Sequence, residues 1–470
     1  MEFGKGIFRY LYISSAEIDG YTKCFREVAI RTPVNRETHK LRKMSATGWM
    51  RDAAPQEGVD SSLIFGVLLV YIAFIPLKFQ IRWILVRIQL VLFVLVALRV
   101  LIGLWRVNVT KTQLIVVGTL TFTFCATLIG QLVAVPGDNF DHLPQVSRFL
   151  VIGLVATLEL NSVRRLKQIL SFISAIAAVV SLLSIVNLFV PLPFAYTGQV
   201  RSFGLMALDL PRSLGIWMSF GSYGVLAVAG LAHTGMYALR PAALTSSQSS
   251  IRRALAVAAL CLILISVILG RSRSTLIAIA FVSVWGFGVA AFHPESRSAG
   301  RSIVSVGILL ICGILFVFNL PLISQAIIGA NTASVSGRIE QYQYAVELML
   351  RRPLLGWGWN YFGQAFGTSY TVHNVWLLVG VSVGVPVLLL WLYMFYRLGI
   401  DSFRLVFVSD VHTRAIGIVG FALFIGGVVE LALYPGFTPV NAVLIGILAS
   451  LGRIRWSETP TRSPTATVDE

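Results

Sequence analysis

The sequence predicts an all-α polytopic membrane protein with about twelve transmembrane helices. The chain of 470 residues is 56% hydrophobic and only 13% charged, which excludes an ordinary soluble domain. Its apolar residues also gather into twelve stretches, and a helix that crosses the hydrocarbon needs about 20 such residues. The stretches are Ser62–Leu77, Trp83–Leu104, Gln113–Val135, Arg148–Leu160, Leu166–Val190, Arg212–Ala232, Arg253–Leu269, Ser274–Phe292, Ser302–Ile323, His373–Tyr396, Arg414–Leu433 and Phe437–Gly452.

Basic residues predict the side of the membrane on which each loop lies. With the N-terminus in the cytoplasm, most basic loop residues fall on the cytoplasmic side, as the positive-inside rule requires. Both termini are then cytoplasmic, and the net charge of +17 is assigned to inner loops that face anionic membrane lipids rather than to nucleic acid. Four arginines fall on the outer side, where they are candidates to hold an anionic substrate: Arg201, Arg271, Arg273 and Arg338.

The two ends of the chain differ from the membrane domain expected at residues 62–456. Residues 1–61 hold charges of both signs and no apolar run long enough for a signal peptide, so we expect a cytoplasmic tail. Met44 is an alternative native start, because it would leave a normal short leader. Residues 457–470 are rich in Thr, Ser and Pro and predict a disordered tail.

The outer loop at residues 324–372, between the ninth and tenth stretches, contains an expected amphipathic helix. Ser334 to Gly337 offer helix-capping residues, and Glu340 is then expected in the first turn. Pro353 should end the helix. Such a helix would lie at the outer membrane surface with Arg338 at its start. The residues that recur at helical spacing and predict one apolar face are Ile339, Tyr342, Val346, Met349 and Leu350.

An aromatic turn follows this helix. Trp357 and Trp359 alternate with Gly356 and Gly358. Tryptophan is enriched at membrane interfaces, so the structural interpretation of Trp357 is an interfacial anchor. The functional interpretation is that its ring stacks against a sugar ring of the substrate.

Four short motifs resemble those of the O-antigen ligase and polymerase superfamily. They occur in the expected order and on the same predicted side of the membrane. The motifs are Arg201-Ser202-Phe203-Gly204, Ser272-Arg273-Ser274, Gly337-Arg338 with Arg352-Pro353-Leu354-Leu355-Gly356-Trp357-Gly358, and His373-Asn374. The resemblance covers residues 201–384, which we expect to be the catalytic region, and it implies a GT-C-like glycosyltransferase with a large periplasmic loop.

One departure from the family pattern weakens the resemblance to the ligase subtype. Ligases of the family carry Gly, Thr or Tyr three residues after the glycine that follows His-Asn, whereas this chain has Gly384 and then Val387. We therefore favour a polymerase of lipid-linked repeat units over a ligase.

The resemblance implies transfer of a glycan from an undecaprenyl-diphosphate-linked oligosaccharide donor to a hydroxyl of a glycan or lipid-linked acceptor. The reaction would take place at the periplasmic face of the bacterial inner membrane. Arg201, Arg273 and Arg338 would bind the donor diphosphate, since guanidinium groups grip phosphate oxygens bidentately and stay charged. His373 would accept the acceptor proton, and attack opposite the diphosphate would invert the anomeric centre. We expect no metal and no other cofactor, because the outer loops show no Asp-x-Asp or other evident metal motif.

Three further residues have weaker assignments. Arg271 is interpreted as an interfacial neighbour or a secondary substrate contact, and Asn374 as the cap of the tenth span. Glu430, near the outer end of the eleventh span, either pairs with a neighbouring helix or faces the same site, since a charge inside the membrane is costly.

Two other classes of protein stay open. A lipid-linked glycan flippase also needs many spans, but it should place charges along the whole translocation path. This chain collects them on one face, which favours an enzyme. A small-anion transporter is the third possibility.

Overall fold

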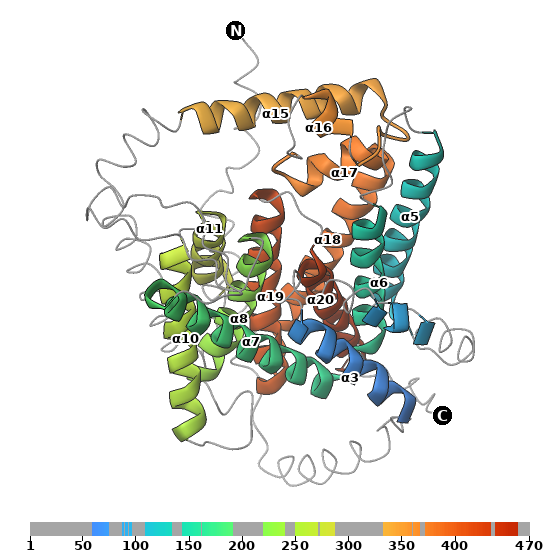
Figure 1. Ribbon diagram of the computed structural model, residues 1–470. Coiled ribbons are helices and arrows are strands. Elements are labelled where there is room, and N and C mark those ends of the chain that lie inside the picture. The colour runs from blue at the N-terminus through green and yellow to red at the C-terminus, as the bar shows by residue number, and fades with distance from the viewer. Residues whose placement is uncertain are drawn as a thin grey trace, which may run out of the picture. The chain divides into compact units, whose positions relative to one another are not determined.

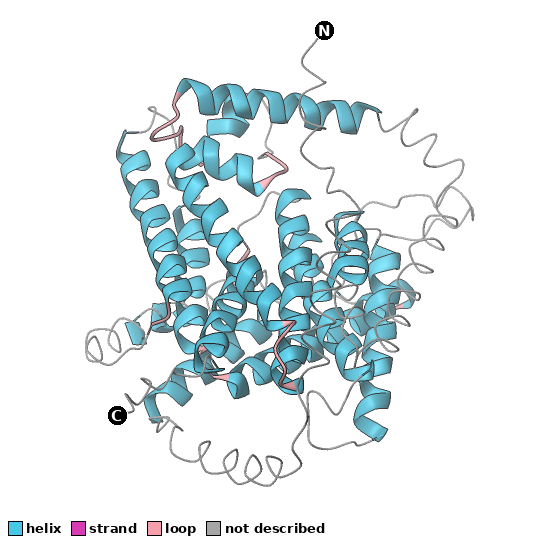
Figure 2. Cartoon of the chain, turned by 180° about the vertical axis from the view of Figure 1, so that it is seen from behind, coloured by secondary structure: helices cyan, strands magenta, loops and turns pink. Residues whose placement is uncertain are grey.

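The computed structural model describes residues 59–74, 87–88, 90–92, 94–95, 109–133, 143–160, 162–190, 220–239, 250–270, 273–286, 332–359, 361–366, 372–433 and 438–458. All regular structure in these ranges is helical, as Figure 2 shows. The helices are α3 (Val59–Phe74), α5 (Lys111–Val133), α6 (Leu143–Glu159), α7 (Val163–Phe189), α8 (Phe220–Leu239), α10 (Ser250–Gly270), α11 (Arg273–Phe281), the π-helical turn η4 (Val282–Gly286), α15 (Thr332–Arg351), α16 (Tyr361–Ala365), α17 (Val375–Val383), α18 (Val385–Leu405), α19 (Val411–Leu433) and α20 (Pro439–Glu458).

Five of the described helices are long and apolar enough to cross a membrane: α5, α7, α10, α18 and α19. They correspond to the third, fifth, seventh, tenth and eleventh predicted spans, so the all-α membrane class is confirmed. α3 and α20 contain shorter apolar segments at the first and twelfth stretches. The second stretch lies largely, and the ninth entirely, outside the described residues.

The prediction of one continuous tenth span, His373–Tyr396, is wrong. The helix breaks at Gly384, which has φ +92° and separates the short α17 from the membrane-length α18. Glycine adopts positive φ without steric cost, and Pro386 suits the first turn of α18. His373 therefore precedes a nine-residue helix and does not begin a membrane span.

Small residues let the helices pack closely, as is common in membrane proteins. An added Cβ at Gly446 of α20 would overlap Ala156 of α6, and one at Gly426 of α19 would lie 2.9 Å from Val282 of η4. α7, α8 and α10 pack against one another, and α19 contacts α8, α11 and α17 as well as α18. α19 therefore links the helix that begins at Arg273 to the helix that follows His373.

α5 connects two polar regions of the bundle. Near its start, Gln113 Nε2 donates to the Thr157 carbonyl at 2.9 Å. Near its end, Thr127 Oγ1 accepts a 3.1 Å hydrogen bond from Trp359 Nε1, in the loop that follows α15. Fourteen residues separate these two points of α5, about 21 Å at the α-helical rise of ~1.5 Å per residue.

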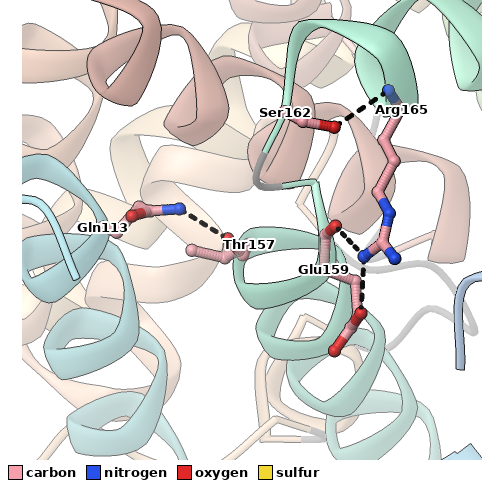
Figure 3. Close-up of polar contacts among 5 residues, drawn as sticks. All are labelled: Gln113, Thr157, Glu159, Ser162 and Arg165. Carbon is pink, nitrogen blue, oxygen red and sulfur yellow. Dashed lines mark hydrogen bonds and ion pairs between the residues drawn. The ribbon is translucent and has the colours of Figure 1, made fainter. Parts of the chain in front are cut away.

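The turn between α6 and α7 contains a buried ion pair (Figure 3). Arg165 Nη1 lies 3.0 Å from Glu159 Oε2, and the two side chains are 3% and 1% exposed. The same nitrogen donates to the Glu159 carbonyl, and the guanidinium lies 5.3 Å from the centre of the Phe65 ring. Arg165 lies between the fourth and fifth predicted stretches, in a loop predicted to be cytoplasmic, so the sequence assigns its charge to anionic lipid. That assignment is wrong for this residue, because a partner inside the protein neutralises it.

Candidate active site

α15 lies crosswise at the end of the bundle, beside α17 (Figure 1). The helix begins at Thr332, so Ser334 to Gly337 lie inside it and do not cap it, and Glu340 lies beyond its first turn. The helix ends at Arg351, directly before Arg352 and Pro353, as predicted.

The predicted single apolar face of α15 divides in two. Ala345 and Leu348 are buried in a small core with residues of α16 and α17. Ile339, Val346 and Leu350 are instead 51%, 42% and 75% exposed. Glu347 and Arg351 form an exposed ion pair on a third side. A helix with one side on protein, one apolar side uncovered and one charged side suits a membrane–water interface.

The loop after α15 is built around the break between α17 and α18. The Trp357 N–H donates to Val381 O at 2.8 Å, and the Gly358 N–H donates to Ser382 O at 3.0 Å. Both acceptors belong to the last turn of α17, whose carbonyls have no partner within the helix. On the other side of the break, the Val385 N–H donates to Pro353 O at 2.7 Å. We call residues 353–358 the clamp, because they bind both helices.

Glycines make this close approach possible. A Cβ at Gly356, which has φ +65°, would lie 2.6 Å from Ser382 O. A Cβ at Gly384 would overlap the Leu354 carbonyl. The glycines of the predicted family motif therefore have a structural role that the spacing of the motif did not reveal.

Trp357 is held by protein groups on its ring and at its indole nitrogen. Nε1 donates to the Leu348 carbonyl at 2.8 Å. The Tyr361 ring stacks on it at 4.4 Å, and the Arg352 guanidinium lies 4.2 Å from its centre. These contacts explain the residue as part of the clamp's packing, so we do not include it among the proposed substrate contacts.

The backbone on either side of His373 is fixed. Val372 is fully buried in the small core beneath α15. Asn374 caps α17, because its Oδ1 accepts from the Leu377 N–H at 3.1 Å, which confirms the predicted cap. The carbonyl of His373 accepts a 3.0 Å hydrogen bond from the Tyr342 hydroxyl.

The side chain of His373 is half-buried, and among the described residues its imidazole has no hydrogen-bond partner. Burial lowers the pKa of His373 below its usual value, and the positive charge of Arg338 lowers it further. The imidazole is therefore held in the neutral form, which accepts a proton.

Arg338 is exposed on α15, one turn before Tyr342. Its charge acts on both neighbours: it lowers the pKa of His373, and it opposes the rise that burial causes in the pKa of Tyr342. The structure thus brings together Arg338 and His373, two of the predicted site residues. Tyr342 joins them, although the sequence had shown it only as a member of an apolar face.

Arg273 is the first residue of α11, and its side chain lies outside the described part of the structure. Arg201 and Arg271 lie outside the described residues altogether. Glu430 is 1% exposed on α19 and lies close to Thr275, in the first turn of α11. An added Cβ at Gly224 of α8 would overlap Glu430 Oε1 and lie 2.6 Å from Thr275 Oγ1. The carboxylate therefore lies beside the start of the helix that Arg273 begins.

Among the described side chains, no group of three or more His, Cys, Asp or Glu residues is placed to hold a metal ion.

The fold defines an all-α, multi-pass membrane protein. Residues 257–392 match the family model described as O-antigen ligase, so this segment of the chain is similar to O-antigen ligase domains. The resemblance expected from the short motifs is confirmed there. The matched segment contains Arg271, Arg273, Arg338, Trp357 and His373, whereas Arg201 and Glu430 lie outside it. No curated protein matches the chain.

Proposed function

We propose that the chain is a membrane glycosyltransferase of surface polysaccharide assembly. It would move a glycan from an undecaprenyl-diphosphate-linked donor to an acceptor hydroxyl at the periplasmic face of the bacterial inner membrane. The observation that supports the proposal is the 3.0 Å hydrogen bond that ties α15, four residues after Arg338, to the His373 backbone within the segment similar to O-antigen ligases.

The proposed chemistry is an inverting displacement. The imidazole of His373 removes the proton of the acceptor hydroxyl, whose oxygen attacks the anomeric carbon of the donor. The bond from that carbon to the diphosphate oxygen breaks, and undecaprenyl diphosphate leaves. Because charge develops on the leaving diphosphate in the transition state, fixed guanidinium groups stabilise that state more than the bound donor. Arg338 has this role in the proposal, together with Arg201 and Arg273.

Glu430 has a supporting role in the proposal. The buried Glu430 carboxylate lies beside the first turn of α11, where the positive end of the helix dipole stabilises a negative charge. It would help to fix the segment that bears Arg271 and Arg273.

The decisive experiment separates donor binding from transfer. The chain is reconstituted in nanodiscs with lipid-linked oligosaccharide extracted from a strain that lacks this protein, and the release of undecaprenyl diphosphate is measured. We expect His373→Ala to bind the donor as the wild type does but to release almost no undecaprenyl diphosphate. We expect Arg338→Ala to weaken binding and to slow release by one to two decades, since a charge-assisted contact contributes ~1.5–3 kcal/mol. Normal release by the His373 variant at equal abundance would remove the base from the mechanism.

Two further measurements test the rest of the proposal. Release should survive EDTA, and a loss restored by magnesium or manganese would contradict the metal-independent reaction. Single cysteines placed in residues 324–372 of a cysteine-free chain should react with an impermeant thiol reagent in spheroplasts. Labelling in their place beside Arg164, in the predicted cytoplasmic loop between the fourth and fifth stretches, would reverse the proposed orientation.

The form of transfer, which we propose to be polymerisation, is tested in a deletion strain. Loss of long chains while single-repeat product remains would support a polymerase. Accumulation of long lipid-linked chains would show a ligase. A flippase would leave undecaprenyl diphosphate release in nanodiscs at background.

A further inference from the structure

Tyr342 is the residue of α15 that bonds to the backbone of His373. Its hydroxyl donates to the His373 carbonyl at 3.0 Å, across 31 residues of sequence. The hydroxyl cannot make this bond unless α15 is held at one position along the loop that leads into α17. The bond therefore fixes a distance between two elements, beyond the local shape of either.

Arg338 lies four residues before Tyr342 on the same helix, so the two side chains are neighbours along one helical row. The small core takes Ala345 and Leu348 from the second half of the helix, and Tyr342 packs at its edge, whereas Arg338 is exposed. The Tyr342 hydrogen bond ties α15 to the segment carrying His373, one helical turn after Arg338.

We propose that Tyr342 is a positioning residue that holds Arg338 and His373 in register for glycan transfer. The inference rests on the proposed function. In that reaction the base and the diphosphate-binding guanidinium act on opposite sides of the same anomeric carbon. A small error in their separation misaligns the attacking oxygen with the leaving group, and transfer rates are sensitive to such errors.

The chain offers a matched control two residues away. Tyr344 packs its ring on Phe362 and Phe366, with centroids 5.8 Å and 5.5 Å apart, and its hydroxyl makes no hydrogen bond with the described residues. Tyr344→Phe and Tyr342→Phe each remove one hydroxyl from the same helix. Only the second removes the bond to His373.

The experiment measures single-turnover release of undecaprenyl diphosphate, donor affinity and thermal unfolding for both variants. At saturating donor we expect Tyr342→Phe to slow release about five- to tenfold, the scale of one net hydrogen bond. Donor affinity should stay within about twofold and the melting temperature within about 2 °C of the wild type, because the ring and its packing are kept. Tyr344→Phe should behave as the wild type in all three measurements.

A coupling measurement tests whether Tyr342 acts through the pair. In an Arg338→Ala background, Tyr342→Phe should slow the release of undecaprenyl diphosphate by less than about twofold, since one of the two residues that Tyr342 aligns has been removed. An unchanged five- to tenfold cost in that background would overturn the inference, and so would wild-type release by Tyr342→Phe. An equal loss in Tyr344→Phe would also overturn it, because it would show a general packing effect.

Failure of the proposed function gives a different pattern. If His373→Ala releases undecaprenyl diphosphate normally, the base assignment is overturned, whatever the result for Tyr342. If His373→Ala is inactive while Tyr342→Phe is normal, only the positioning role is overturned.

Discussion

Two arginines act on a titratable side chain in opposite ways: Arg165 at the turn between α6 and α7, and Arg338 on α15, whose charge acts on His373 before α17. Arg165 is buried and paired with Glu159 at 3.0 Å. Arg338 is exposed, and it acts on His373 through its charge while the imidazole has no hydrogen-bond partner among the described residues. The charges of Arg165 and Glu159 neutralise each other within the protein. The Arg338 guanidinium and the His373 imidazole are available to a ligand.

The contrast teaches how to separate structural from functional charge in a membrane protein. Removing one partner of a buried pair leaves an uncompensated charge in a medium of low polarity, so the fold suffers. Removing an exposed charge costs the fold little, so a loss of activity can be assigned to the reaction.

The largest expected effect is therefore on folding at the buried pair. Arg165→Ala should lower the free energy of unfolding by ~3–5 kcal/mol, because it removes the positive charge that lies 3.0 Å from the buried Glu159 carboxylate. Arg164→Ala, the exposed neighbour, is the control and should change stability by less than about 0.5 kcal/mol. Denaturant or thermal unfolding in detergent measures both. Equal stability of the two variants would remove the distinction between the regions.

The clamp should show the next largest effect. Gly384→Ala forces a Cβ into the Leu354 carbonyl at a φ of +92°, and we expect it to cost ~2–4 kcal/mol. Gly118→Ala on α5 is the control, since nothing lies within 4 Å of its Cβ position. That variant should be neutral or slightly more stable. If both variants unfold alike, the break between α17 and α18 is not held by the clamp.

A pH measurement sharpens the comparison at Arg338. His373 must be neutral to accept a proton, and its pKa is lowered by burial and by Arg338, so transfer should fail only as pH drops through this lowered value. In Arg338→Ala the pKa should rise towards its ordinary value, which moves the acid limb of kcat/KM to higher pH. Arg338→Lys keeps the charge and should keep the acid limb near that of the wild type. An unmoved limb in the alanine variant would show that Arg338 does not act on the base.

The smallest expected effect is at Trp357. Trp357→Phe loses the Nε1 bond to the Leu348 carbonyl but keeps an aromatic ring beside Tyr361 and Arg352. We expect a loss of about 1 kcal/mol in stability, with transfer by the folded protein close to normal. A large loss of transfer at unchanged stability would instead support stacking of this ring against a sugar.

The sequence was sufficient for the helical class because long apolar runs leave few alternatives in a membrane. It was insufficient at Gly384, since the apolar run continues on both sides of the glycine and hydropathy does not register a change of backbone direction. Arg165 was misassigned for a related reason. A basic loop residue looks the same in sequence whether it faces lipid or pairs with Glu159 across a turn.

The candidate site was predictable where the order of motifs could be compared with a known family. That comparison gave Arg338 and His373. It did not give Tyr342, because a tyrosine at helical spacing resembles any other member of an apolar face. Its role depends on a hydrogen bond to a residue 31 positions away, which helical periodicity does not report.

The break at Gly384 also separates the part of the protein that matches the bilayer from the part that carries the histidine. α18 has 21 residues, about 31 Å of helix, which suits a hydrocarbon layer ~30 Å thick without help from α17. In a thicker or thinner membrane, α18 can change its tilt to suit the lipid. The backbone around His373 is held by Asn374 and by Tyr342, and the clamp holds the other end of α17; all of these are contacts within the protein. Its position relative to Arg338 is therefore set by the chain itself, and membranes of different thickness should leave that spacing unchanged.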